Sequence, residues 1–252
     1  MGACYRELKK WPEEMAAYQE VLKKYGNTDY APRAMFEMGE CYQITKEYST
    51  AIEVLRDLVW KYPKSNEAPR ALIKIGMIYR QLKKFDDELA MYKKVVEHFG
   101  STPYAADAQM KIGESYQRAR NLKEALRAYY RVVKNYPDAD EAPRALMNVA
   151  ECYLLFKDPP HAVKTYQQIG DSYPGSEHAA RAQVALGTHY TDFGEVEKAR
   201  AAFSRVISDF SLYPRQVIEA YIGLGDMDQS LGDMQRALNS YKEAYLVPYS
   251  GK

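Results

Sequence analysis

The chain has 252 residues, 46% of them hydrophobic and 27% charged, with 35 basic and 34 acidic side chains and a formal net charge of +1. These proportions are typical of a folded globular protein, and no stretch is apolar enough to predict a membrane span. The basic residues form no continuous stripe, which excludes the usual way of binding nucleic-acid phosphates. We therefore expect neither nucleic-acid binding nor direct insertion into a membrane.

The chain is built from a repeated unit. Six segments align with one another at a spacing of 37 residues four times and then 38. These segments begin at Ala31, Ala68, Ala105, Ala142, Ala179 and Val217. Repeats of this length are typical of solenoids. Each residue is given a position number, 1 to 37, that counts from the start of its unit.

The first half of each unit predicts a helix, called helix A. Position 4 is alanine in every unit, position 8 is aliphatic or methionine, and position 9 is glycine in five units and Ala150 in the other. Position 12 is tyrosine in five units. Spacings of three and four residues place these side chains on one helical face. Pro32, Pro69 and Pro143 stand near the start of helix A, where a missing backbone N–H costs nothing.

The second half of each unit predicts helix B. Position 21 is mostly alanine, position 25 is aromatic in five units, and position 28 is aliphatic or alanine. An aromatic residue at position 32 is often followed by proline or glycine, which ends the helix. Gly194 and Gly232 mark the turn between the two helices. Each unit therefore predicts helix A over positions 1–15 and helix B over positions 18–32, followed by a linker.

This pattern resembles the tetratricopeptide repeat, most fully at residues 224–244, LGDMDQSLGDMQRALNSYKEA. The resemblance covers essentially the whole chain, although the units exceed the family's usual length of about 34 residues. It implies an all-α, right-handed superhelical solenoid of antiparallel helix pairs over residues 1–252. A partial repeat at 1–30 would precede full repeats at 31–67, 68–104, 105–141, 142–178, 179–216 and 217–252. The Tyr-Pro-x-Ser linkers further resemble bacterial envelope proteins, namely the lipoprotein of the outer-membrane assembly machine and the Tol–Pal periplasmic coordinator.

Both ends of the chain carry a prediction. Residues 1–5 match residues 38–42, so the chain begins halfway along a helix A. We therefore expect a fragment of a longer protein, and the lack of a signal peptide does not exclude an exported one. At the other end, Asp228 replaces the tyrosine of position 12. This replacement predicts a final repeat with a polar outer face, and an array that closes near Tyr245.

The residues that usually carry chemistry form no catalytic pattern. Cys4, Cys41 and Cys152 share position 11, which predicts small buried side chains rather than a redox or metal site. The four histidines lack the spacing of metal ligands. Fifteen of the 23 tyrosines lie at positions 12, 25 and 32, which are packing positions. With no phosphate loop or hydrolase motif present either, we predict no enzyme activity, no cofactor and no metal.

The resemblance places a partner-binding groove on the helix A side. Position 3 is arginine in four units, and position 13 is glutamine or arginine in four. Such donors can bind the carbonyls and carboxylates of a partner, but the arginines could instead pair with the linker acids Glu67 and Glu141. Two leucines of the fourth full repeat replace mostly polar residues, which indicates either an apolar contact patch or a local repacking. The predicted partner-binding residues are Arg33, Gln43, Arg70, Arg80, Gln117, Arg144, Leu154, Leu155 and Arg181.

The sequence thus predicts a scaffold that binds a protein or peptide partner, as part of a bacterial envelope complex. Its expected location is the periplasm or the outer membrane, with the cytoplasm as the alternative. Two other functions stay open: a structural protein that self-assembles, and an accessory domain of a larger polysaccharide-export or glycosyltransferase protein. Carbohydrate binding by Tyr30, Tyr104 and Tyr130 is a third and weaker alternative.

Overall fold

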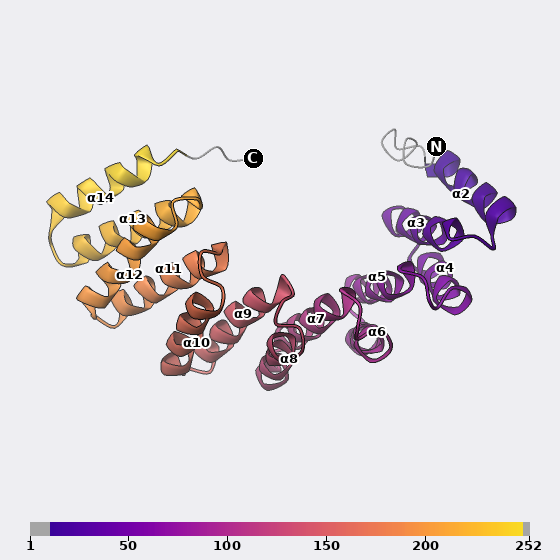
Figure 1. Ribbon diagram of the computed structural model, residues 1–252, viewed down its shortest axis with the longest axis horizontal. Coiled ribbons are helices and arrows are strands. Elements are labelled where there is room, and N and C mark those ends of the chain that lie inside the picture. The colour runs from indigo at the N-terminus through magenta and orange to yellow at the C-terminus, as the bar shows by residue number, and fades with distance from the viewer. Residues whose placement is uncertain (1–10, 249–252) are drawn as a thin grey trace. The chain divides into compact units, whose positions relative to one another are not determined.

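A computed structural model describes residues 11–248, and this part of the chain contains thirteen helices and no strand (Figure 1). The helices are α2 (Trp11–Tyr25), α3 (Tyr30–Ile44), α4 (Tyr48–Lys61), α5 (Glu67–Gln81), α6 (Phe85–His98), α7 (Tyr104–Arg118), α8 (Leu122–Asn135), α9 (Glu141–Leu155), α10 (Pro159–Ser172), α11 (Glu177–Asp192), α12 (Val196–Asp209), α13 (Pro214–Ser230) and α14 (Met234–Leu246). The odd-numbered helices from α3 onward are the predicted A helices, and the even-numbered ones are the B helices. The all-α solenoid class is confirmed, whereas Cys4 and the half helix expected around residues 1–5 lie outside the described residues.

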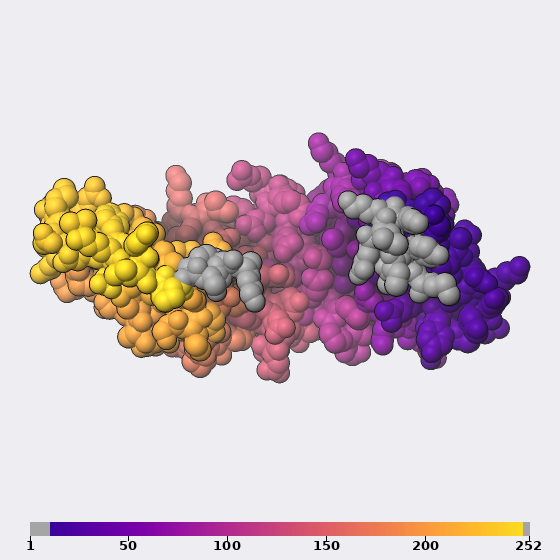
Figure 2. Space-filling view, turned by 90° about the horizontal axis from the view of Figure 1, so that it is seen from above, coloured from indigo at the N-terminus to yellow at the C-terminus, as the bar shows by residue number. Residues whose placement is uncertain are grey.

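Residues Met1–Ala128 form one compact unit, called the N-unit, and Tyr129–Lys252 form another, called the C-unit. In the N-unit, each helix from α2 to α7 packs against the next, and the A helices α3, α5 and α7 also contact one another. In the C-unit the same holds for α9 to α14, with contacts among α9, α11 and α13. Figure 2 shows this order as successive bands of colour within each unit. The A helices thus form a continuous surface in each unit, which we call its A-face. Among residues 11–248, no helix has the length and apolar character needed to cross a membrane.

Helices A and B of one repeat meet at the glycine of position 9. A Cβ atom on Gly76 would lie 2.5 Å from Cε1 of Tyr92, and one on Gly187 would lie 2.5 Å from Cε1 of Phe203. Both rings are buried and stand at position 25 of the same repeat. The small residue therefore allows the close approach that the sequence predicts, and the ring fills the space beside it.

Each turn from helix A to helix B contains one residue with a left-handed backbone. Its φ lies between 58° and 82° at position 16 of all six full repeats. These residues are Lys46, Lys83, Arg120, Lys157, Gly194 and Gly232. The two predicted glycine turns are confirmed, and basic residues occupy the same conformation in the other four repeats.

Two tyrosines at position 32 join their linker to the linker one repeat earlier. Tyr62 donates a hydrogen bond from its hydroxyl to the carbonyl of Gly26, at 2.6 Å, and Tyr173 donates one to the carbonyl of Pro137, at 3.2 Å. These bonds satisfy backbone carbonyls that lie outside the helices. Tyr62 and Tyr173 therefore join adjacent repeats as well as filling space.

Glu88 occupies an alanine position and is buried, with 3% of its surface exposed. Its Oε1 accepts hydrogen bonds from the Ser115 hydroxyl at 2.7 Å and from Arg118 Nη2 at 2.5 Å. Ser115 and Arg118 belong to α7 of the next repeat, so a polar cluster joins two repeats of the N-unit. Hydrogen bonding and the guanidinium charge offset the cost of burying the carboxylate.

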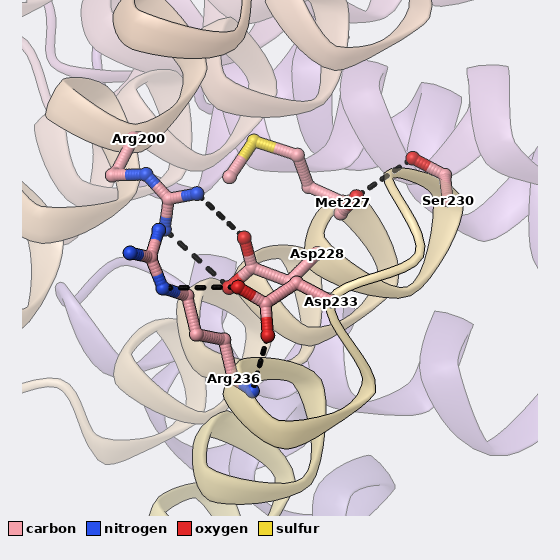
Figure 3. Close-up of polar contacts among 6 residues, drawn as sticks. All are labelled: Arg200, Met227, Asp228, Ser230, Asp233 and Arg236. Atoms are coloured by element: carbon pink, nitrogen blue, oxygen red, sulfur yellow. Dashed lines mark hydrogen bonds and ion pairs between the residues drawn. The ribbon is translucent and has the colours of Figure 1, made fainter.

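Asp228 does not form a polar outer face, and that expectation is wrong. Only 2% of its surface is exposed, and its Oδ1 lies 2.5 Å from Nη2 of Arg200 in α12 (Figure 3). This contact holds the pKa of Arg200 above its usual range, because the carboxylate accepts its hydrogen bond. The aspartate therefore replaces the packing of a tyrosine by an ion pair between two repeats of the C-unit. Beside it, the carboxylate of Asp233 caps α14 by accepting a hydrogen bond from the N–H of Arg236.

Candidate functional site

The A-face carries the arginines that stand at position 3. Arg33, Arg144 and Arg181 are exposed, and none of them takes part in an ion pair among residues 11–248. The linker acids Glu67 and Glu141 make no ion pair within the described part of the chain either, so the alternative in which they neutralise the arginines is not observed. Each of these guanidinium groups is carried by a packed helix and keeps its donors available. An ordered row of charged donors is a suitable surface for carboxylates and backbone carbonyls.

Arg70, the fourth of these arginines, is held differently. Its guanidinium carbon lies 4.2 Å from the ring centroid of Phe36, which projects from the preceding A helix. The Lys74 ammonium group lies 5.9 Å from the same ring and forms an ion pair with Glu40 at 2.7 Å. Phe36, Arg70 and Lys74 therefore form one aromatic and basic cluster on the A-face of the N-unit, in which stacking fixes the planar guanidinium. The sequence alone did not indicate this pairing.

A second basic cluster lies on the A-face of the C-unit. Burial lowers the pKa of His178, and the positive charges of Arg181 and Arg144 lower it further, while Glu177 acts in the opposite direction. Two arginines one repeat apart therefore act on the same imidazole. Their combined field favours the approach of a negatively charged group.

The remaining predicted residues are placed less favourably for binding. Gln43 donates a hydrogen bond to Oε1 of Gln81 at 3.3 Å, and Arg80 and Gln117 are half-buried. In contrast, Leu154 and Leu155 expose 42% and 50% of their surfaces at the end of α9, as an apolar patch requires. In the C-unit, Arg144 and Arg181 act on the same imidazole, and the two leucines are left uncovered. The binding role of all nine residues stays a prediction.

Two of the three cysteines lie in the described part of the chain, and both are buried, as the sequence predicts. Cys41 and Cys152 expose 1% and 0% of their surfaces. Burial raises the pKa of the Cys152 thiol to about 11, and the nearby charge of Glu151 contributes to this rise. A thiol in this state is a poor nucleophile, because the thiolate is the reactive form.

The C-unit contains a cavity of about 520 Å³ that is lined by residues of α10, α11 and α12. Gly170 lines it at position 29, where other full repeats have Val59, Val96, Val133 and Ile207. A Cβ atom on Gly170 would meet no atom within 4 Å. The missing side chain thus accounts for part of the open space.

Comparisons with known proteins agree with this architecture. The sequence model of the tetratricopeptide repeat-like domain matches residues 59–223, and that of the tetratricopeptide repeat matches residues 1–28 and 33–65. Since the first match spans more than half of the chain, the chain belongs to the tetratricopeptide-repeat family. Such repeats generally mediate protein–protein interaction, and the fold is typically a scaffold rather than an enzyme. No curated protein matches the chain in sequence.

Several solved structures share the fold. The C-terminal part of a TPR repeat-containing protein from Cytophaga hutchinsonii is 16% identical, with a TM-score of 0.64 over 100% of this chain and 95% of that one. BtubC from P. vanneervenii is 15% identical, with a TM-score of 0.63 over 82% of this chain and 92% of that one. PilF from Pseudomonas aeruginosa is 16% identical, with a TM-score of 0.56 over 89% and 94% of the two chains. At these identities the likeness shows the fold alone.

Proposed function

We propose that this chain is a protein-interaction scaffold whose A-face binds a partner segment rich in carboxylates. The observation that carries the proposal is the exposure of Arg33, Arg144 and Arg181, whose guanidinium groups have no ion-pair partner among the described residues. A charged donor on a packed helix loses little backbone conformational entropy when it binds a carboxylate. The leucines at the end of α9 add an apolar contact on the same A helix as Arg144.

The bound segment is expected to be an internal stretch of the partner rather than its carboxyl terminus. Position 10 of helix A is acidic in four repeats, at Glu40, Glu114, Glu151 and Asp226. A terminal carboxylate placed beside these acids would be repelled. The family's chaperone-tail clamp also needs an asparagine at this position, which is absent from all six full repeats. Alternating bases and acids along helix A instead suit a segment with charges of both signs and a surplus of acids.

We further propose that the partner belongs to a bacterial envelope complex. This part of the proposal depends on the resemblance of the Tyr-Pro-x-Ser linkers to envelope proteins, with the periplasm or outer membrane as the location. Fractionation of the source cells would test it. Recovery of the protein only from the cytoplasm would contradict the envelope location and leave the binding proposal intact.

The A-face is tested by reversing charge in one unit at a time. The variant Arg144→Glu with Arg181→Glu reverses the two position-3 arginines of the C-unit, and Arg33→Glu with Arg70→Glu reverses those of the N-unit. The matched control for the C-unit pair is Arg131→Glu with Lys164→Glu, two exposed basic residues of B helices. Each purified protein is used to capture partners from an envelope extract, and circular dichroism verifies that all the variants remain helical.

A partner retained by the native chain and the control, but lost with the A-face variants, would support the proposal and identify the partner. A partner retained by every variant would contradict it and place the contact away from the arginines. The expected loss is at least about tenfold in affinity, since hydrogen bonds to charged groups contribute about 1.5–3 kcal/mol each.

A further inference from the structure

The turns between helices A and B form an edge on each unit, and the two edges differ in charge. We call positions 13–17 of the three full repeats in a unit its turn edge, which means residues 43–47, 80–84 and 117–121 in the N-unit. The edge of the C-unit comprises residues 154–158, 191–195 and 229–233. The N-unit edge has six basic residues and one acid, whereas the C-unit edge has one basic residue and four acids. A chain of nearly zero net charge therefore carries two edges of opposite sign.

The charges on these edges are accessible. On the N-unit edge, Lys46, Lys83, Lys84 and Arg120 are exposed, and none of them forms an ion pair within residues 11–248. On the C-unit edge, Asp192 is exposed and has no ion-pair partner there either. The other three acids of that edge each contact a side chain in the first turn of the helix that follows. Asp158 contacts His161, Glu195 contacts Lys198 and Asp233 contacts Arg236. Surface ion pairs of this kind are weak and can be exchanged for others.

The C-unit edge is also apolar. Position 15 is Phe156, Phe193 and Leu231 in its three repeats. These residues expose 38%, 61% and 55% of their surfaces. The same position in the N-unit has Thr45, Leu82 and Ala119. A row of three large apolar residues at three successive turns is more than isolated surface exposure, and it marks a contact surface. The N-unit edge presents two apolar side chains of its own, Ile44 and Leu82, with 49% and 38% exposed.

The turns on both edges recur once per repeat. In each unit the three A helices lie side by side, so their turns follow one another at the distance between packed helices, about 8–10 Å. Since both edges are built from the same repeat, a basic turn on one edge and an acidic turn on the other can meet at each of three successive repeats. This match of period, sign and apolar content makes another copy of the chain a suitable partner for each edge.

We propose that the chain self-associates by binding the turn edge of its N-unit to the turn edge of the C-unit in a second copy. Lys46, Lys83 and Arg120 face the acids of the partner, and Phe193 and Leu231 are covered by the opposite edge. The contact uses the turns and leaves the position-3 arginines of the A-face uncovered. Self-association therefore leaves the arginines of the partner site free, whereas Leu154 and Leu155, which belong to the C-unit edge, would be shared between the two contacts.

Sedimentation velocity of the full chain over a wide concentration range tests this proposal. At low ionic strength the native chain is expected to associate, and in about 1 M salt, where the Debye length falls to about 3 Å, association should weaken by at least tenfold. The triple variant Lys46→Glu, Lys83→Glu and Arg120→Glu should sediment as a monomer. Its matched control, Lys23→Glu, Lys64→Glu and Lys94→Glu, changes three exposed lysines outside the edge and should associate like the native chain.

A charge exchange makes the test specific. The variant Asp192→Lys with Glu195→Lys should be monomeric alone. A mixture with the Lys46, Lys83 and Arg120 reversal should associate, since the native basic edge of one variant meets the native acidic edge of the other, and the two reversed edges are also opposite in sign. The apolar contribution is tested by Phe193→Ala with Leu231→Ala, against the control Leu212→Ala, an exposed linker leucine. A native chain that stays monomeric at every concentration and salt would overturn the proposal. Association that persists in both reversal variants would also overturn it, because another surface would then be responsible.

Discussion

At the scale of single residues, the contact between position 9 and position 25 shows how one hydrogen atom can decide the packing of two helices. Tyr92 is fully buried against the bare Cα of Gly76, and any side chain on that glycine would overlap with its ring. In α9, by contrast, Ala150 takes the same position and is itself fully buried, with Tyr166 at position 25. The repeat therefore tolerates one methyl group there only where the neighbouring helices have adjusted to it.

We predict that Gly76→Ala lowers the free energy of unfolding by about 1–3 kcal/mol, because the new methyl group overpacks against Tyr92. The control is Gly170→Ala in α10, where the added Cβ meets open space. That change should raise stability by about 0.4–1 kcal/mol, through the reduced freedom of the unfolded chain. Urea unfolding followed by circular dichroism measures both variants. Equal effects of the two substitutions would contradict the proposed contact.

His178 provides a second test at the residue scale, since its pKa is lowered first by burial and then by Arg181. Between the lowered pKa and the ordinary value of 6.5, the unfolded chain binds more protons than the folded one. Stability should therefore fall as the pH decreases through the ordinary histidine range. Arg181→Gln should move the pKa of His178 back toward its usual value without fully restoring it, because burial remains. An NMR titration of the imidazole measures this shift.

The control for His178 is Lys164→Gln, which removes an exposed positive charge from a B helix and should leave the pKa of His178 unchanged. A carboxylate-rich segment bound to Arg144 and Arg181 should raise the same pKa, since it neutralises the charges that lower it. This titration thus also reports on binding at the A-face. An unchanged pKa in Arg181→Gln would mean that the arginine and the imidazole are not neighbours in solution.

At the scale of helices, the sequence predicts most of what is observed. Positions 1–15 and 18–32 of the second full repeat predict helices over residues 68–82 and 85–99, and the structure has α5 at Glu67–Gln81 and α6 at Phe85–His98. The agreement has a physical basis, because the apolar period and the proline-containing linkers fix each helix locally.

What the sequence could not supply is the pairing of charges between repeats. Glu88 and Arg118 lie 30 residues apart, and Asp228 and Arg200 lie 28 apart, so neither pair follows from the period of one helix. A signal was nevertheless present for Glu88. Glu88 replaces the usual alanine of position 21 in one repeat. In the next repeat, Ser115 replaces the cysteine or isoleucine found at position 11 of other repeats. Comparing departures from the repeat in adjacent units, rather than one position at a time, would have found this pair.

The ends of the A helices give a prediction at the same scale. Lys83 has φ of 58°, a conformation that side chains of L-residues disfavour by about 1–2 kcal/mol and that glycine adopts freely. We expect Lys83→Gly to raise the free energy of unfolding, because glycine relieves this strain. The gain is limited to about 1 kcal/mol, since glycine also has more freedom in the unfolded chain. Conversely, Gly194→Ala should lower stability by about 1 kcal/mol. Urea midpoints of the two variants, with Lys84→Gly as a control at negative φ, distinguish this effect from a simple loss of charge.

At the scale of the whole molecule, stability is a sum of local terms. Within each unit, the helices in contact are neighbours or next neighbours along the chain. A solenoid of this kind can lose structure in one repeat while distant repeats stay folded, because few contacts couple them. This property also bears on function, since a partner that binds along several repeats would couple repeats that are otherwise independent.

We therefore predict that Gly225→Ala, which places a methyl group against the ring of Tyr241, destabilises only the end of the C-unit. Native-state hydrogen exchange should accelerate at least fivefold in α13 and α14, which corresponds to about 1 kcal/mol, and stay unchanged in α3 to α6. The corresponding change in the N-unit, Gly39→Ala against Leu55, should give the reverse pattern. Equal acceleration in both units from either variant would mean that the chain unfolds as one cooperative body. In that case the repeats would not act independently, and a partner bound to one A-face would stabilise the whole chain rather than the repeats it contacts.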